Sequence, residues 1–222
     1  MTDSFFGIDK SWIDAGLDID LIRNVMMQIL EKRKSVEILP KQEDVLNAIK
    51  LCPLDIVKVL IIGQDPYPSS EHAHGLAFSS LSDKTPASLK NIFKKLEQDF
   101  HCEHKTNTLI NWEKQGVLLL NTALTFEGKE TKLLREHTKL WSPIIENIFS
   151  ILKKRGNLIV MRWGSHAQKA GEIFDESNGI NGITILDTTH PSPLSAHRGF
   201  MSSEHFKKCN EILGKNAIDW ST

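Results

Sequence analysis

Cysteine and tyrosine are scarce in this sequence of 222 residues, which has three cysteines and a single tyrosine. The cysteines, Cys52, Cys102 and Cys209, are an odd number and follow no recognisable spacing. Such a set argues against a disulfide framework and favours a reducing compartment. We therefore expect the protein to be cytoplasmic.

Long hydrophobic runs and an excess of charge of one sign are also missing. No apolar stretch is long enough to span a bilayer, and the first residues, MTDSFFGIDKSW, lack the basic and apolar regions of a secretory signal. We expect no contact with a membrane. The net charge is only −1, so a nucleic-acid partner would have to bind a local basic surface.

Motifs that bind nucleotide phosphates are absent, and the one candidate metal motif is incomplete. Neither GxxxxGK[ST] nor GxGxxG occurs, which weakens any proposal of phosphate-cleaving nucleotide chemistry. His101, Cys102 and His104 form a candidate metal cluster, but a structural zinc site needs four ligands and no second pair accompanies them. We expect a solvated loop there, no metal site and no cofactor.

Four short apolar runs alternate with helical patterns along the chain. The runs are almost continuously apolar, as expected of strands buried on both faces, and cover 57–62, 116–120, 157–161 and 182–186. Apolar residues at helical spacing cover 17–34, 43–51, 88–100, 108–115, 137–154, 165–176 and 203–213, and Asp18 or Asp20 is a candidate N-cap of the first. The pattern predicts an α/β fold with a central parallel sheet flanked by helices. No linker or repeat interrupts it, which favours one domain over residues 1–222.

Polar segments follow each predicted strand, and ligands of open parallel sheets bind outside the carboxyl ends of the strands. The segments are GQDPYP (63–68), NTALT (121–125), RWGSHA (162–167) and TTHPSPLSAHRGF (188–200). Taken singly, each is as easily explained by turn chemistry, helix capping or packing. Together they bring a carboxylate, an amide and an imidazole to one edge, a set suited to binding a flat heterocycle and to acid–base work.

These segments resemble those of the family 1 uracil-DNA glycosylases, in the family's order, from about residue 40 to 213. GQDPYP resembles the family's water-activating loop, and HPSPLSAHRGF (190–200) resembles its minor-groove loop. The uracil-stacking, DNA-contacting, uracil-reading and phosphate-binding segments are matched by HGLAFS (74–79), TPASLKNI (85–92), GVLLLNTALT (116–125) and WGSHAQ (163–168). The resemblance implies a single α/β domain with a central four-stranded parallel sheet, in agreement with the strands above.

The chemistry that this resemblance implies is excision of uracil from DNA by hydrolysis of the N-glycosidic bond, which initiates base excision repair. The target nucleotide must first leave the stack and enter a pocket. Asp65 would stabilise the positive charge on the sugar and orient the attacking water, and His190, as a neutral imidazole, would donate to the departing uracil anion. Neither a Schiff base, nor strand cleavage, nor a metal is implied.

The resemblance also assigns the residues that bind the base. Phe78 would stack on uracil, Asn121 would pair with its edge and so reject cytosine, and the ring of Tyr67 would exclude the thymine methyl group. Gly63 and Gln64 complete this set.

DNA contacts are expected from Leu194 as a wedge in the vacated stack, and from small residues that grip phosphates. The full set is Pro86, Ser88, Gly164, Ser165, Ser192, Leu194, Ser195 and Arg198. The implied partners are uracil-containing DNA, single- or double-stranded, and protein inhibitors of such enzymes. We expect a monomer.

Several positions depart from the family's pattern. Pro68 stands where a histidine is usual, which predicts altered water positioning or a shifted pH profile. His197 replaces a frequent tyrosine and Arg162 a residue more often apolar, and we expect both changes to affect DNA contacts. The alternative hypothesis is a noncatalytic DNA-binding or replication-accessory protein that keeps the pocket as a scaffold. A pure scaffold would have no physical need for the combined set of catalytic and base-reading residues.

Overall fold

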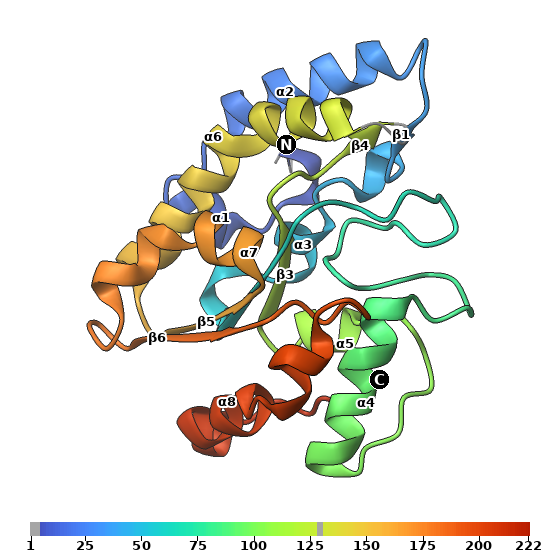
Figure 1. Ribbon diagram of the computed structural model, residues 1–222. Helices are drawn as coiled ribbons and strands as arrows, with labels where there is room; N and C mark the ends of the chain where they lie inside the picture. The colour runs from blue at the N-terminus through green and yellow to red at the C-terminus, as the bar shows by residue number, and fades with distance from the viewer. Residues whose placement is uncertain (1–4, 128–130) are drawn as a thin grey trace.

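The computed structural model describes residues 5–127 and 131–222, and four parallel strands form its central sheet. Their order across the sheet is β3 (Val117–Asn121), β2 (Val59–Gly63), β5 (Leu158–Trp163) and β6 (Ile183–Thr188). The predicted α/β architecture with a four-stranded parallel sheet is therefore confirmed (Figure 1).

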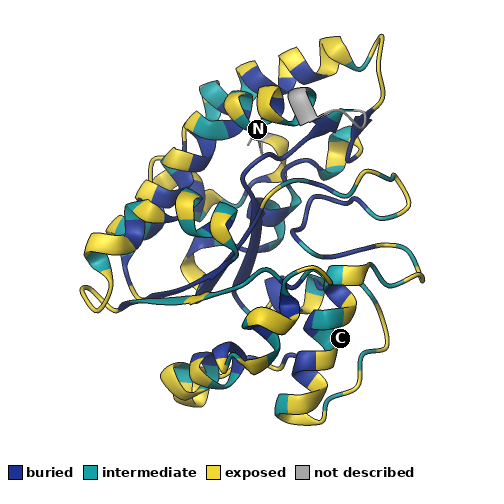
Figure 2. Ribbon diagram, viewed as in Figure 1, coloured by how far each residue is buried: buried dark blue, intermediate teal, exposed yellow. Residues whose placement is uncertain are grey.

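Burial explains why these strands read as continuous apolar runs. Every residue of β2, β3 and β5 is buried, because each of these strands is covered on both faces (Figure 2). Only Ile183 is buried in the edge strand β6. The core of the molecule therefore lies on and around the three strands that carry Gly63, Asn121 and Trp163 at their ends.

Helices cover both faces of the sheet (Figure 1). On one side lie α2 (Ile19–Lys32) and α6 (Thr131–Arg155), and on the other lie α4 (Ala87–Phe100) and α8 (His205–Leu213). Of the two candidate caps of the first long helix, Asp18 is the residue that accepts a hydrogen bond from the Leu21 amide, at 2.8 Å.

All four strands extend one or two residues past their predicted ends. In the observed register Gly63 lies opposite Asn121, and Arg162 lies opposite Asp187. Parallel pairing uses backbone groups and needs no apolar side chain, so the ladder continues into polar residues that hydrophobicity alone assigns to loops. The polar residues at the sheet edge consequently start from rigid strands.

Some predicted helices are shorter or divided. The helix expected over 165–176 ends at Ala170 as α7 (Ser165–Ala170), and after Gly171 the chain continues as a 3₁₀ helix (Glu172–Ser177). The helix expected over 43–51 likewise divides into a 3₁₀ turn (Gln42–Asp44) and α3 (Asn47–Leu51), and the one expected over 108–115 is only α5 (Ile110–Glu113). Short-range spacing does not distinguish a 3₁₀ turn from an α-turn.

Small elements complete the fold and were not predicted. These are α1 (Lys10–Asp14) and a two-stranded antiparallel sheet of β1 (Ile38–Leu39) and β4 (Phe126–Glu127). The remaining 3₁₀ turns are Phe5–Gly7, Leu54–Ile56, Ala196–Arg198, Phe200–Ser202 and Gly214–Asn216. Within the described residues, no helix is both long and apolar enough to cross a membrane.

Candidate active site

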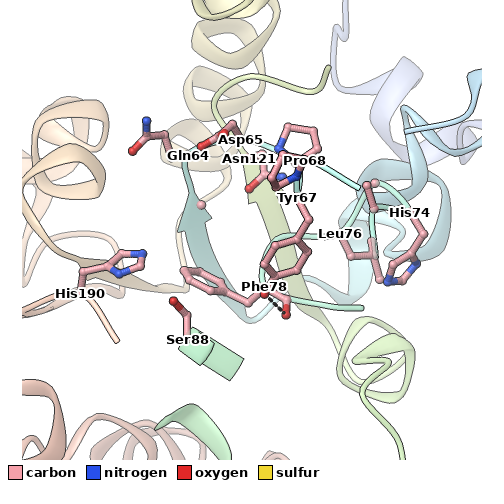
Figure 3. A pocket seen from close by; sticks show the side chains of 14 residues that line it. Gln64, Asp65, Tyr67, Pro68, His74, Leu76, Phe78, Ser88, Asn121 and His190 are labelled. Carbon is pink, nitrogen blue, oxygen red and sulfur yellow. Dashed lines mark hydrogen bonds between the residues drawn. The ribbon is translucent and has the colours of Figure 1, made fainter. Parts of the chain in front are cut away.

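A cavity of about 240 Å³ opens at the carboxyl ends of β2 and β3. The residues predicted to perform catalysis or bind the base all line it: Gly63, Gln64, Asp65, Tyr67, Phe78, Asn121 and His190. Figure 3 shows the side chains of all of these residues except Gly63 around one hollow. The structure thus brings together residues that lie up to 127 positions apart in the sequence (190 − 63).

Gly63 is required where β2 and β3 end. A methyl group on its Cα would lie 2.1 Å from Oδ1 of Asn121 and 2.7 Å from Cβ of Ala77. The absence of a side chain therefore lets the Asn121 amide lie across the end of β2.

Asn121 is buried, with 4% of its surface exposed, and its side-chain amide lines the cavity without a hydrogen bond to any described residue. Its amide atoms are not fully enclosed, so a ligand in the cavity can reach them and supply the missing hydrogen bonds. Its carbonyl accepts and its NH₂ group donates, so a ligand edge with a matching donor and acceptor completes the site.

Asp65 lies at the turn that follows β2. Burial raises the pKa of its carboxyl group to about 6. No described residue hydrogen-bonds to this carboxylate, which distinguishes it from a structural aspartate in a turn or cap. At neutral pH the site therefore holds an ionised, partly desolvated carboxylate beside the cavity.

Backbone hydrogen bonds fix the loop that carries Asp65. The Thr122 amide donates to the Gly63 carbonyl at 3.1 Å, and the Ala123 amide donates to the Gln64 carbonyl at 2.9 Å. The chain after β3 thus holds the peptide groups immediately before Asp65.

Two aromatic side chains line the cavity. The Tyr67 hydroxyl donates to the Phe78 carbonyl at 3.0 Å, which joins the beginning and the end of the loop. Phe78 has a left-handed backbone (φ 63°), which is uncommon for an aromatic residue. Its ring contacts those of Trp163 and His190, at centroid distances of 5.3 and 5.7 Å.

His190 is held in one tautomer. The Ser192 amide donates to Nδ1 of His190 at 3.0 Å, so in the neutral ring Nε2 carries the proton. Burial lowers the pKa of this histidine, and the nearby His166 lowers it further. At neutral pH His190 is an uncharged donor in the same cavity as Asp65.

The residues predicted to contact DNA lie beside this cavity. A second hollow, of about 550 Å³, contains Gly164, Ser165, Ser195 and Arg198 and shares His190 with the first. Pro86 caps α4, and Ser88 lines the first cavity. The Leu194 side chain is 82% exposed, which excludes a role as a buried loop anchor.

Hydroxyl groups stiffen the loop around Leu194. Thr189 donates to the Ser195 carbonyl at 3.0 Å and accepts from the Phe200 amide at 2.9 Å. The Ser195 hydroxyl donates to the His190 carbonyl at 2.8 Å and lies 2.9 Å from the Ser192 hydroxyl. Leu194 consequently projects from a loop that internal hydrogen bonds hold in shape.

The expectation that Arg162 affects DNA contacts is wrong. Its side chain is buried and forms ion pairs with Asp187 (2.7 Å) and Asp175 (2.5 Å). Because it lies opposite Asp187 in the β5–β6 ladder, the guanidinium group is used within the protein. His197 is exposed, beside Arg198, and its effect on DNA contacts stays a prediction.

The cluster of His101, Cys102 and His104 is a loop after α4. Cys102 Sγ lies 3.6 Å from Nε2 of His104, whose ring stacks on Phe93 at 4.0 Å. In the part of the chain that the structure describes, no three His, Cys, Asp or Glu side chains are grouped to hold a metal ion.

Three residues near the cavity were not singled out from the sequence. His74 lines the cavity, and its Nε2 forms a 2.7 Å hydrogen bond with the Ser79 hydroxyl, which accepts from the Leu109 amide. Thr122 and His166 are joined by a hydrogen bond of 2.7 Å behind the Asp65 loop. The available signal was position: Thr122 and His166 lie within segments that follow predicted strands, and His74 lies within HGLAFS (74–79), but none has an unusual residue type.

The family model of the Uracil DNA glycosylase superfamily matches residues 49–214. This chain belongs to that superfamily. A uracil-DNA glycosylase of Yersinia enterocolitica is 43% identical over 198 residues, which are 86% of this chain and 84% of the relative. One from Haemophilus influenzae is 40% identical over 223 residues, or 95% of this chain and 99% of the relative.

Solved structures of the superfamily share the fold. Mimivirus uracil-DNA glycosylase superposes with a TM-score of 0.81 at 26% identity, over 99% of this chain and 89% of that chain. A mimivirus UNG variant in complex with UGI has a TM-score of 0.84 at 25% identity, over 99% and 90%. The UNG of Nitratifractor salsuginis, at 22% identity and a TM-score of 0.67, supports the fold alone.

Proposed function

We propose that this protein excises uracil from DNA by hydrolysing the N-glycosidic bond, as the first step of base excision repair. One observation carries the proposal. The carboxylate of Asp65, which has no hydrogen-bond partner among the described residues, lines the same cavity as the neutral His190, whose Nε2–H is free to donate. Bond cleavage separates charge between the sugar and the base, and these groups stabilise opposite signs.

Asp65 acts on the sugar side of the reaction. As the bond between C1′ and the base nitrogen breaks, positive charge develops on the sugar and attracts the carboxylate. The same carboxylate orients a water whose oxygen forms the new bond to C1′. The water's proton is released and uracil leaves with the bonding electrons.

His190 acts on the base side. Its Nε2–H donates to a carbonyl oxygen of the departing uracil anion, which lowers the free energy of the transition state. The hydrogen bond from the Ser192 amide keeps Nδ1 an acceptor, so the ring presents the donor without being charged.

Base selection follows from the buried amide and the two rings. Asn121 pairs with one donor and one acceptor of the uracil edge, and cytosine presents the opposite pattern there. Phe78 stacks on the base and Tyr67 blocks a methyl group at C5. Gly63 leaves room for this arrangement, and Gln64 adds contacts near the base.

DNA is held by the neighbouring hollow and its loops. Exposed Leu194 fills the stack that the flipped nucleotide leaves. Phosphates are gripped by backbone and side-chain donors of Ser88, Ser165, Ser192 and Ser195, with Pro86 and Gly164 shaping their loops and Arg198 adding charge. UGI, seen with the mimivirus enzyme, is a further proposed partner.

Release of free uracil tests the proposal. Single-stranded and duplex oligonucleotides with one deoxyuridine are incubated with the protein in excess EDTA, with thymine and cytosine oligonucleotides as controls. We expect release of uracil alone, and a decrease on the order of 10³-fold in Asp65→Asn. DNA binding without any release would instead support the noncatalytic alternative.

The pH dependence gives an independent test of Asp65. Because the pKa of Asp65 is about 6, its carboxylate becomes protonated as the pH falls through that value, and the protonated form is inactive. Excision should therefore decline below about pH 6 and be constant from 7 to 8. A rate that stays constant down to pH 5 would contradict the role of an ionised Asp65.

A further inference from the structure

A chain of hydrogen bonds lies behind the loop that carries Asp65. The Thr122 hydroxyl donates to the Gln64 carbonyl at 3.0 Å and lies 2.7 Å from Nε2 of His166. Thr122 follows β3, Gln64 follows β2 and His166 belongs to α7, so three separate segments meet here.

Both contacts of the Thr122 hydroxyl are hydrogen bonds in only one arrangement of its proton. A hydroxyl has one proton, and the proton of Thr122 is given to the Gln64 carbonyl, which can only accept. The Thr122 oxygen must therefore accept from Nε2–H of His166. His166 Nε2–H therefore donates to the Thr122 hydroxyl, and that hydroxyl donates to the Gln64 carbonyl. The same carbonyl belongs to the peptide group that joins Gln64 to Asp65.

Packing alone does not hold His166 in place. Its side chain and that of Thr122 line a cavity of about 330 Å³ bounded by α6 residues such as Ile145 and Phe149. An imidazole with space beside it depends on its hydrogen bond for orientation, whereas Thr122 is buried.

These hydrogen bonds connect segments that have different roles in the proposed function, on which this inference rests. His166 directly follows Ser165, a phosphate-gripping residue, and the Gln64 carbonyl directly precedes Asp65. We propose that Thr122 and His166 are positioning residues that set the Asp65 carboxylate and link its placement to the phosphate-binding end of α7.

Substitutions at Thr122 separate the hydroxyl from the side-chain volume. Thr122→Val keeps the shape and removes both hydrogen bonds, and Thr122→Ser keeps the hydroxyl. Thr138→Val is the control, because Thr138 lines the same cavity but donates to the Leu134 carbonyl within α6. Single-turnover excision and binding are measured on a single-stranded deoxyuridine oligonucleotide.

We expect Thr122→Val to reduce the excision rate about fivefold to tenfold, as loss of a hydrogen bond to a positioned group does, with unchanged DNA affinity. Thr122→Ser should restore most of the rate, and Thr138→Val should equal the wild type. A Thr122→Val protein with the wild-type rate, or a Thr122→Ser protein as slow as Thr122→Val, would overturn the proposal.

His166 provides a test that does not depend on a buried threonine. His166→Gln places an amide donor near the position of Nε2, whereas His166→Leu places none. The excision rate should therefore fall in His166→Leu and be largely restored in His166→Gln. Equal rates in the two variants would also overturn the proposal.

In an Asp65→Asn background, Thr122→Val should reduce the excision rate little further, because Thr122 acts through Asp65. Failure of the proposed function is distinct, since the wild type would then release no uracil.

Discussion

The loops after β2 and after β6 both begin at the carboxyl edge of the sheet, but their polar side chains are used in opposite ways. In the first, Asp65 has no side-chain partner among the described residues, and neither has Asn121, which ends the neighbouring strand β3. In the second, Thr189 and Ser195 use their hydroxyls inside the loop, and the exposed side chain is the apolar Leu194.

This difference indicates that the loop after β2 acts in the chemical step and the loop after β6 holds the DNA. Unpartnered polar groups in a cavity raise the free energy of the empty protein and are available to a substrate. A loop whose hydroxyls are satisfied is stiff and presents an apolar side chain at a fixed place. Substitutions after β2 should therefore change the chemical step, and substitutions after β6, except at His190, should change duplex binding.

His190→Ala should cause the largest loss among the residues after β6. It removes the donor to the leaving base, and loss of one such donor reduces a rate by roughly 10²- to 10³-fold. Single-turnover excision with saturating protein measures it, with His197→Ala as the control because His197 is exposed on the same loop. Equal rates in the two variants would contradict the division of roles.

Gly63→Ala should be next, at about 10²-fold, although it removes no functional group. The new methyl would lie 2.1 Å from Oδ1 of Asn121 and so displace the base-reading amide. The rate is compared with that of Asn121→Ala, and the two variants should lose similar activity. Full activity in Gly63→Ala beside an inactive Asn121→Ala would show that the close approach is unimportant.

Leu194→Ala should have a smaller and selective effect. Its wedge acts only where a stack is vacated, so we expect about a tenfold loss on duplex DNA and little change on a short single strand. Comparison of kcat/KM on the two substrates measures this. An equal loss on both would mean that Leu194 contributes to the chemical step.

Much of the fold could be predicted because its strands are buried on both faces. Continuous apolar runs located all four strands of the central sheet, and the position of polar residues after them located its functional edge. Strand ends were less predictable, since the ladder continues through Arg162 and Asp187, which are paired with each other.

The candidate site could be predicted as a set of residues but not as a network. Asp65, Asn121 and His190 follow strands and match a family motif, and the structure places them in one cavity. The tautomer of His190 depends on the Ser192 amide, and the role of Thr122 depends on His166, 44 residues further along the chain. Such pairings between common residue types leave no signal in a single sequence.

The stability of Asp65→Asn tests the central claim most directly, that the fold holds a desolvated carboxylate for chemistry. The carboxyl pKa is about 6 in the folded protein and about 3.9 in an unfolded chain. At pH 7.5 the ionised group thus opposes folding, and below pH 4 both states are protonated, so this effect disappears.

Urea unfolding of both proteins at pH 7.5 and pH 4 measures this difference. The account predicts that Asp65→Asn is more stable by roughly 1 to 2 kcal/mol at pH 7.5, that most of this gain is lost at pH 4, and that the variant hardly releases uracil. A variant that is less stable than the wild type at pH 7.5 would contradict it.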